Sequence, residues 1–245
     1  MSYGVLITAR LKSKRLPKKI IKNINENNII VFLIQRLKLK FNKEKIVIIT
    51  SNSNQDKILE QIAHKEKIKI YKGHPQDVLQ RMYFAAKKFQ FKNFISCTAD
   101  NPFTDPNFAK KLISFHIKNK NDLSIMKGLP IGIFSYAINT KGLKKLINDK
   151  FSKNTENWLG YFTENKKLKV GYFNTKFNFQ GINKKLRLTV DFLQDLNLIR
   201  EILKKTKTKQ PSLNNIIKII KANPGILKIN SKVKQKPEKK PVFIK

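Results

Sequence analysis

Cysteine is almost absent from this chain of 245 residues, which contains only Cys97. A single cysteine excludes an intrachain disulfide and is typical of proteins of a reducing compartment, so we expect a cytoplasmic protein. Cys97 lies in the apolar run 94–97, and we expect a buried and unreactive thiol rather than a nucleophile.

Long hydrophobic runs are also missing. No apolar segment approaches the length of about 20 residues that a membrane-spanning helix needs, and the amino-terminal residues lack the pattern of a signal peptide. We therefore expect neither a membrane span nor a membrane partner.

Glycine is scarce, with nine residues, and the chain has no GxGxxG or GxxxxGK[ST] motif. These glycine-rich loops are the usual dinucleotide and P-loop routes to phosphate binding. Any phosphate site must therefore be built without them. The three histidines, His64, His74 and His116, lie in polar contexts and are predicted to be on the surface.

Acidic residues are few: 16 stand against 52 basic ones, which gives a formal net charge of +36. Such a charge would ordinarily favour nucleic acid as a partner. The charges are spread along the whole chain, however, and only six of them are arginines. No arginine-rich helix, aromatic RNA-binding signature or zinc-ligand spacing accompanies them, so no specific nucleic-acid partner is expected. A non-catalytic, basic nucleic-acid-binding protein remains the less favoured alternative.

Short apolar runs alternate with amphipathic stretches in the first half, which predicts βα units and a mostly parallel sheet flanked by helices. The expected strands are 3–8, 45–50, 68–71 and 93–98. The expected helices are 28–41, 55–65, 77–89 and one that begins after Asp105-Pro106.

The second half is less regular. Strands are predicted at 122–126, 131–138, 168–173 and 186–190, and helices at 141–147, around Trp158 and at 192–203. We expect a single α/β domain over residues 1–228, with a nucleotide-binding half (1–120) and a smaller acceptor-binding half (121–228) that contains β-structure. Residues 229–245 are rich in lysine and proline and are predicted to be a mobile tail.

A loop rich in cations follows the first predicted strand. It contains Arg10, Ser13, Arg15, Lys18 and Lys19. Ligands of open α/β sheets bind beyond the carboxyl ends of the strands, where this loop is expected to lie. Arginine binds phosphate oxygens in pairs and lysine supplies a mobile point charge, so the loop is predicted to bind a polyphosphate. The alternative is a solvated basic loop in a lysine-rich chain.

Two aspartates follow predicted strands. Asp100 comes after strand 93–98, and Asp191 after strand 186–190. If both strands belong to the sheet, both carboxylates emerge near the basic loop, where they would suit Mg²⁺ with a bound triphosphate. Each has a structural alternative: Asp191 could form a capping box with Gln194, and Asp100 could fold an Asx turn.

The segment from Gly73 to Arg81 is a further candidate. Arg81 is one of the six arginines and begins a predicted helix at the same edge, where it could contact base, ribose or phosphate. Asp77 and Arg81 are four residues apart, so a simple i,i+4 ion pair is the alternative.

Four motifs together resemble the cytidylyltransferases of the spore-coat-polysaccharide type, which are related to the synthetases of CMP-Kdo and CMP-sialic acids. The resemblance covers about residues 1–205. Its motifs are 8–19, 73–81, 98–106 and 186–196. It implies a Rossmann-like nucleotidyltransferase fold of the glycosyltransferase-A kind. It also implies an enzyme that transfers CMP from CTP to an acidic sugar, nonulosonic or Kdo-like, for surface polysaccharide, and releases pyrophosphate with the help of Mg²⁺.

The resemblance also implies roles for individual residues. Arg15 and Lys19 would be catalytic, and Asp100 and Asp191 would bind the metal. The substrate-binding residues would be Ala9, Arg10, Ser13, Asp77, Arg81, Thr98 and Glu156. A homodimer is a further expectation, because the related synthetases tend to be dimers and residues 131–138 offer apolar surface.

The chain departs from the family pattern at three places. Lys18 stands where the family usually has glycine, the segment 128–132 lacks the usual acidic residues, and an Arg-Glu-His triplet of the family is Thr155-Glu156-Asn157 here. The last two lie in the half expected to bind the acceptor. A different nucleotide or a sugar-phosphate acceptor is therefore the alternative within the enzyme class.

Overall fold

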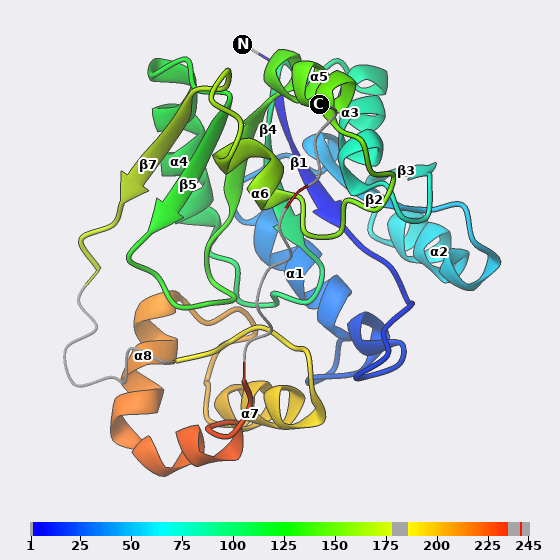
Figure 1. Cartoon of the computed structure of the whole chain (residues 1–245). Helices are drawn as coiled ribbons and strands as arrows, with labels where there is room; N and C mark the ends of the chain where they lie inside the picture. Colours follow the sequence, from blue (N-terminus) through cyan, green and yellow to red (C-terminus); the bar gives the residue numbers. More distant parts are fainter. Residues whose placement is uncertain (1, 178–185, 235–240, 242–245) are drawn as a thin grey trace.

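The computed structural model describes residues 2–177, 186–234 and 241 (Figure 1). No helix within this part of the chain is long and apolar enough to cross a membrane.

One seven-stranded sheet organises the fold, with the strand order β3-β2-β1-β4-β6-β5-β7. The pairings of β1 with β2 and β4, of β2 with β3 and of β5 with β7 are parallel, and β6 runs antiparallel to both of its neighbours. The strands are β1 (Tyr3–Thr8), β2 (Ile46–Ser51), β3 (Lys69–Gly73), β4 (Asn93–Thr98), β5 (Leu123–Lys127), β6 (Tyr136–Asn139) and β7 (Val170–Asn174). The predicted mostly parallel α/β fold is confirmed.

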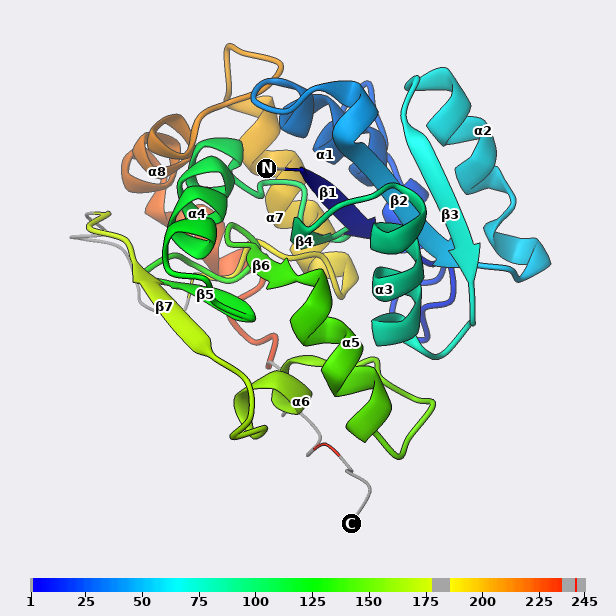
Figure 2. The ribbon, with the colours of Figure 1, turned by 90° about the horizontal axis from the view of Figure 1, so that it is seen from above.

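Helices cover both faces of the sheet, as the view along the layers shows (Figure 2). On one face, apolar side chains of the strands pack against α1 (Ile29–Lys38), α2 (Ile58–Lys65) and α4 (Pro106–Lys118). The other face packs against α3 (Val78–Lys88), α5 (Thr140–Asp149) and α6 (Leu159–Thr163). The two core clusters separate because successive strand residues point to opposite faces; Val5 and Ile7 belong to the first cluster and Leu6 to the second.

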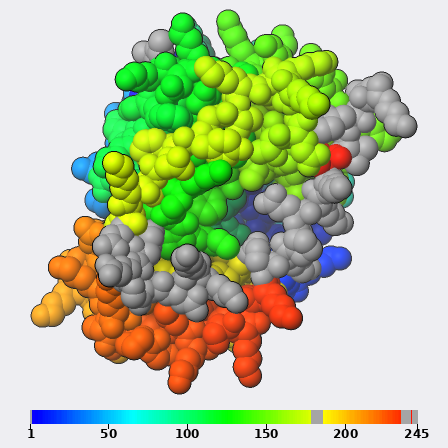
Figure 3. All heavy atoms as spheres, turned by 60° about the vertical axis from the view of Figure 1, so that its left-hand side comes forward, coloured from blue at the N-terminus to red at the C-terminus, as the bar shows by residue number. Residues whose placement is uncertain are grey.

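A third apolar cluster lies beyond the ends of the strands, around α7 (Leu193–Lys204) and α8 (Leu213–Ala222). Figure 3 shows α8 and the segment after it, in orange and red, below the green and yellow-green residues of β5 and β7. Helix α8 was not predicted from the sequence, although serine is a preferred N-cap residue and Ser212 precedes the helix. In the structure the Ser212 hydroxyl accepts a hydrogen bond from the Asn215 amide.

Two strand predictions of the second half are wrong. Residues 186–190 are not a sheet strand: Arg187 makes one isolated bridge with Ile131, and the Val190 amide donates to the Asp100 carbonyl. The segment therefore crosses the ends of the sheet. Of residues 131–138 only those from Tyr136 onward join the sheet, after Gly132 has turned the chain with φ of +96°.

The position of β6 also affects the expected dimer surface. Because β6 pairs with β4 on one side and β5 on the other, it has no open edge. Its apolar residues Ala137 and Ile138 are fully buried in the chain's own core. Within the segment 131–138, Ile131 is exposed, but the strand residues Ala137 and Ile138 do not offer the apolar surface that the dimer expectation used. The homodimer stays a prediction.

The burial of three further residues can be compared with the prediction from the sequence. His116 was expected on the surface but is buried, with its Nδ1 2.9 Å from the Ser124 hydroxyl. Asn230, in the segment predicted to be a mobile tail, is buried after the short helix Pro224–Ile229. Cys97 is buried as expected, and burial raises the pKa of its thiol to about 12.

Candidate active site

The cation-rich loop leaves the carboxyl end of β1, an interior strand of the sheet between β2 and β4, and is held in place by buried polar contacts. The Ala9 amide donates to the Ile49 carbonyl of β2. The Leu11 amide donates to Asp56, whose other carboxylate oxygen accepts from the Ser51 hydroxyl. The loop therefore starts from a fixed backbone at the edge of the sheet where open α/β folds bind ligands.

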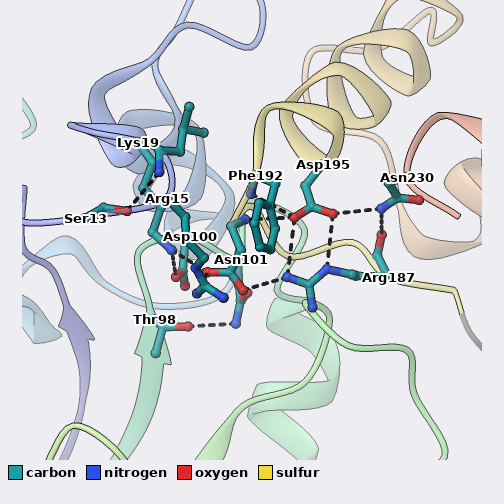
Figure 4. Close-up of polar contacts among 12 residues, drawn as sticks. Ser13, Arg15, Lys19, Thr98, Asp100, Asn101, Arg187, Phe192, Asp195 and Asn230 are labelled. Carbon is teal, nitrogen blue, oxygen red and sulfur yellow. Dashed lines mark hydrogen bonds and ion pairs between the residues drawn. The ribbon is translucent and has the colours of Figure 1, made fainter. Parts of the chain in front are cut away.

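Lys19 joins the two aspartates that were predicted from the sequence. Its Nζ lies 2.5 Å from Oδ2 of Asp100 (Figure 4) and 2.9 Å from Oδ1 of Asp191. Burial lowers the pKa of Lys19, but the two carboxylates outweigh it and raise that pKa above its usual value. Burial likewise raises the pKa of Asp191, and the nearby Lys19, Arg187 and Arg15 cations lower it below its usual value. Lys19 and Asp191 are therefore both charged at neutral pH.

The two arginines of the loop also form ion pairs with carboxylates. An Nη of Arg15 lies 2.7 Å from Asp191, and its guanidinium stacks 5.0 Å above the Phe192 ring. Arg10 contacts Glu156 at 2.5 Å and the Pro75 carbonyl at 2.7 Å. The structure thus brings Arg15, Lys19, Asp100 and Asp191 together, with the Arg10–Glu156 pair as a second contact of the same loop.

Asp191 is held from its other side by Arg187, whose Nη2 lies 2.6 Å from Oδ2 of Asp191. The same guanidinium contacts Asp195, which accepts hydrogen bonds from the amides of Asp191 and Phe192. Asp195, in the first turn of α7, therefore caps the helix start by accepting from the two residues that precede it. The capping box of Asp191 with Gln194 is not formed, which leaves the Asp191 carboxylate directed at the cations.

In the segment 73–81, which was predicted to contact the nucleoside, two polar side chains are buried and bonded within the protein. Asp77 is buried and uses both oxygens internally, at 2.5 Å from Lys150 and 2.9 Å from the Thr155 hydroxyl. Arg81 is also buried and donates to the carbonyls of His74 and Pro75. Burial, followed by the nearby Arg10 charge, lowers the pKa of Arg81 to about 10. The alternative of an i,i+4 ion pair between Asp77 and Arg81 is therefore not observed.

Three other predicted substrate residues lie at the same edge with their own partners. Ala9 is buried beside β2. The Thr98 hydroxyl accepts a hydrogen bond from Asn101, and that of Ser13 accepts a long one of 3.4 Å from the Leu16 amide. Their backbone positions border the cluster.

The donor set fits a divalent cation only in part. Two carboxylates already share one cation, the Lys19 ammonium, so their oxygens converge on a common position. Within residues 2–177, 186–234 and 241, no three acidic, histidine or cysteine side chains are grouped to hold a metal. The remaining ligands would have to be phosphate or water oxygens, as is usual for Mg²⁺.

Sequence reasoning gave no role to several residues that shape this site: Arg187, Asp195, Asn230 and Lys150. Arg187 carried a usable signal, because it is one of six arginines and stands four residues before Asp191, which itself precedes Asp195 by four. Asn230 and Lys150 carried none, since their partners are 35 and 73 residues away in the chain.

The backbone conformation at Lys18 explains why the family usually has glycine at this position. Its backbone has φ of 55° and ψ of 29°, the left-handed region that glycine adopts without steric cost. We expect Lys18→Gly to raise the free energy of unfolding by about 1 kcal/mol in urea denaturation. The exposed Lys14, with negative φ, is the control: Lys14→Gly removes the same charge and should not stabilise. A loss of stability in Lys18→Gly would contradict this explanation.

The mostly parallel sheet and the charged cluster at its carboxyl edge are those of an α/β nucleotidyltransferase fold. A sequence model of the cytidylyltransferase family matches residues 4–221, and the chain belongs to this family.

Relatives and solved structures agree over most of the length. The spore coat polysaccharide biosynthesis protein SpsF of Bacillus subtilis is 25% identical, over 89% of this chain and 94% of the relative. The 3-deoxy-manno-octulosonate cytidylyltransferase of Wigglesworthia glossinidia brevipalpis is 28% identical, over 71% of this chain and 75% of the relative. The structure of a cytidylyltransferase from Leptospira borgpetersenii superposes with a TM-score of 0.85 at 26% identity, covering 93% of this chain and 97% of that one.

Proposed function

We propose that this protein uses CTP and a divalent cation, Mg²⁺, to transfer CMP to an acidic sugar, with release of pyrophosphate. The observation that carries the proposal is the meeting of Lys19 with Asp100 and Asp191 at the carboxyl edge of the sheet. In a chain of the cytidylyltransferase family, a lysine that would bind a triphosphate therefore lies beside two carboxylates that would bind its metal.

The ion pairs indicate how a nucleotide would enter. The three loop cations Arg10, Arg15 and Lys19 each rest on a carboxylate. A triphosphate offers these cations the same charge-assisted contacts, in the bidentate form that suits arginine. Binding would then exchange partners, with the phosphates taking the cations and leaving the aspartates available to the metal.

In the proposed reaction a sugar hydroxyl oxygen attacks the α-phosphorus of CTP. A new P–O bond forms to the sugar, the bond to the β-phosphate oxygen breaks, pyrophosphate leaves with that oxygen, and the hydroxyl proton is released to water. Lys19 and Arg15 would stabilise the negative charge that grows on the phosphoryl and leaving-group oxygens, and this is the main contribution that proteins make to such transfers. A bound metal would add charge neutralisation at the same oxygens, held by Asp100 and Asp191.

The proposal that the acceptor is an acidic sugar is supported by the names of two relatives. One is named for 3-deoxy-manno-octulosonate, an acidic sugar, and another for polysaccharide biosynthesis. Glu156, on the acceptor-side segment and paired with Arg10, is a candidate for linking the two halves of the site.

The test is pyrophosphate release by the purified protein with CTP, Mg²⁺ and a panel of nonulosonic and Kdo-like sugars. We expect release that needs both CTP and one of these acids, with a CMP-sugar as the second product. The same panel with UTP, ATP and GTP, and with sugar phosphates as acceptors, is the control for specificity. Release only with another nucleotide or acceptor class, or silence throughout, would contradict the proposal.

A further inference from the structure

We propose that Asn230 is a positioning residue for Asp191, acting through Asp195 and Arg187. This inference rests on the proposed metal-binding role of Asp191. It gives a role in the site to a segment near the carboxyl terminus, beyond the residues that the family model matches.

The first link is the buried amide of Asn230, which is only 7% exposed. Its Nδ2 lies 2.9 Å from Oδ1 of Asp195 and 3.1 Å from the Arg187 carbonyl. The Asn230 side chain therefore contacts both the first turn of α7 and residues 186–190, which cross the ends of the sheet. Figure 4 shows Asn230, Asp195 and Arg187 facing one another from these three parts of the chain.

The second link is the Asp195 carboxylate, whose side chain is fully buried. Oδ2 accepts from the amides of Asp191 and Phe192, both at 3.0 Å, so it holds the backbone on which Asp191 is mounted. Oδ1 accepts from Nε of Arg187 at 3.1 Å and from Asn230. A carboxylate with this set of donors has little freedom to rotate.

The third link is Arg187, whose planar guanidinium contacts Asp195 with Nε and Asp191 with Nη2. Arg187 thereby fixes one oxygen of Asp191 and leaves the other, Oδ1, to Lys19 and Arg15. The orientation of the proposed metal ligand is thus set by a chain of buried hydrogen bonds that begins at Asn230. Outer partners of this kind typically change metal affinity 10- to 100-fold.

The experiment compares Asn230→Leu with the wild type. Leucine has a similar volume but cannot donate, so Asp195 loses one partner and Arg187 loses its carbonyl contact. We expect the affinity for Mn²⁺ in the presence of CTP, measured by electron paramagnetic resonance, to fall about 10-fold. The Mg²⁺ concentration for half-maximal pyrophosphate release should rise by a similar factor, with a smaller change in KM for CTP.

Asn223→Leu is the matched control, because the side-chain Nδ2 of Asn223 donates to the Ile219 carbonyl of its own helix and has no described contact with the charged cluster. It should lower Tm without changing Mn²⁺ affinity. Arg187→Lys provides a second variant if Asn230→Leu does not fold: lysine keeps the charge but cannot bridge both carboxylates. It should weaken Mn²⁺ binding in the same way.

Unchanged Mn²⁺ affinity in folded Asn230→Leu, with wild-type binding intact, would overturn this inference alone. If Asn230→Leu does not fold, unchanged affinity in Arg187→Lys would overturn it. Failure of the wild type to bind Mn²⁺ with CTP would overturn the inference together with the proposed function.

Discussion

Asp100→Asn is expected to lower kcat for pyrophosphate release by roughly 10²- to 10³-fold, which corresponds to a barrier higher by about 3 to 4 kcal/mol. Asparagine preserves the size of the side chain but removes the charge that now contacts Lys19 at 2.5 Å. It would also remove one of the two carboxylates proposed to hold the metal. The measurement is steady-state pyrophosphate release at saturating CTP and acceptor over a series of Mg²⁺ concentrations.

Asp149→Asn is the control for this experiment. Asp149 ends α5 and its carboxylate makes only a long contact, 3.5 Å, with Asn165 among the described interactions. Its kcat should stay within about twofold of the wild type, since the residue touches none of the loop cations. If folded Asp100→Asn kept a third or more of the wild-type rate, Asp100 would have no central role in the reaction.

The largest loss of stability is expected from Asp77→Asn. Asp77 and Lys150 form a buried ion pair at 2.5 Å, with side chains that are 2% and 8% exposed. Asparagine keeps an oxygen for the Gln80 amide and the Thr155 hydroxyl, so the change isolates the charge. Breaking a buried pair from one side costs about 3–5 kcal/mol, because the partner charge stays buried without compensation. Urea denaturation should show this loss.

The double variant Asp77→Asn/Lys150→Met removes the stranded ammonium and should recover most of the lost stability, which a double-mutant cycle measures directly. Glu60→Gln is the control, since it breaks the exposed pair of Glu60 with Lys72 and should leave stability almost unchanged. A loss in Asp77→Asn no greater than that in Glu60→Gln would mean that the buried pair is not fixing the segment that carries Glu156.

The first half of the fold was predictable because its pattern is local. Strands such as 3–8 and 93–98 are short apolar runs, and Asp105-Pro106 marks the start of α4 as a cap followed by proline. The run 186–190 alternates apolar and polar residues, a pattern that is typical of a strand, but it is not a sheet strand. Its side chains are buried by α7 and α8 rather than by a neighbouring strand, which its own sequence does not encode.

The charged cluster was predictable for a different reason. Arg15, Lys19 and Asp100 follow strands that proved to be adjacent, so the common edge of the sheet brought them together. Asp191 reached the same place although the strand predicted before it does not exist; the Val190 amide instead pairs with the Asp100 carbonyl. The alternative of an i,i+4 pair between Asp77 and Arg81 was wrong, because the partner of Asp77 is Lys150, 73 residues away in the chain.

The most direct test of the central claim is calorimetric titration of the wild-type protein with CTP in the presence of Mg²⁺. We predict saturable binding of one CTP per chain that is stronger than that of UTP, ATP or GTP. Binding should weaken when Mg²⁺ is omitted and when Asp100 is replaced by asparagine. Equal, steeply salt-dependent binding of all nucleotides and of generic RNA would contradict it, because a basic surface, and not a CTP site, would then account for the positive charge.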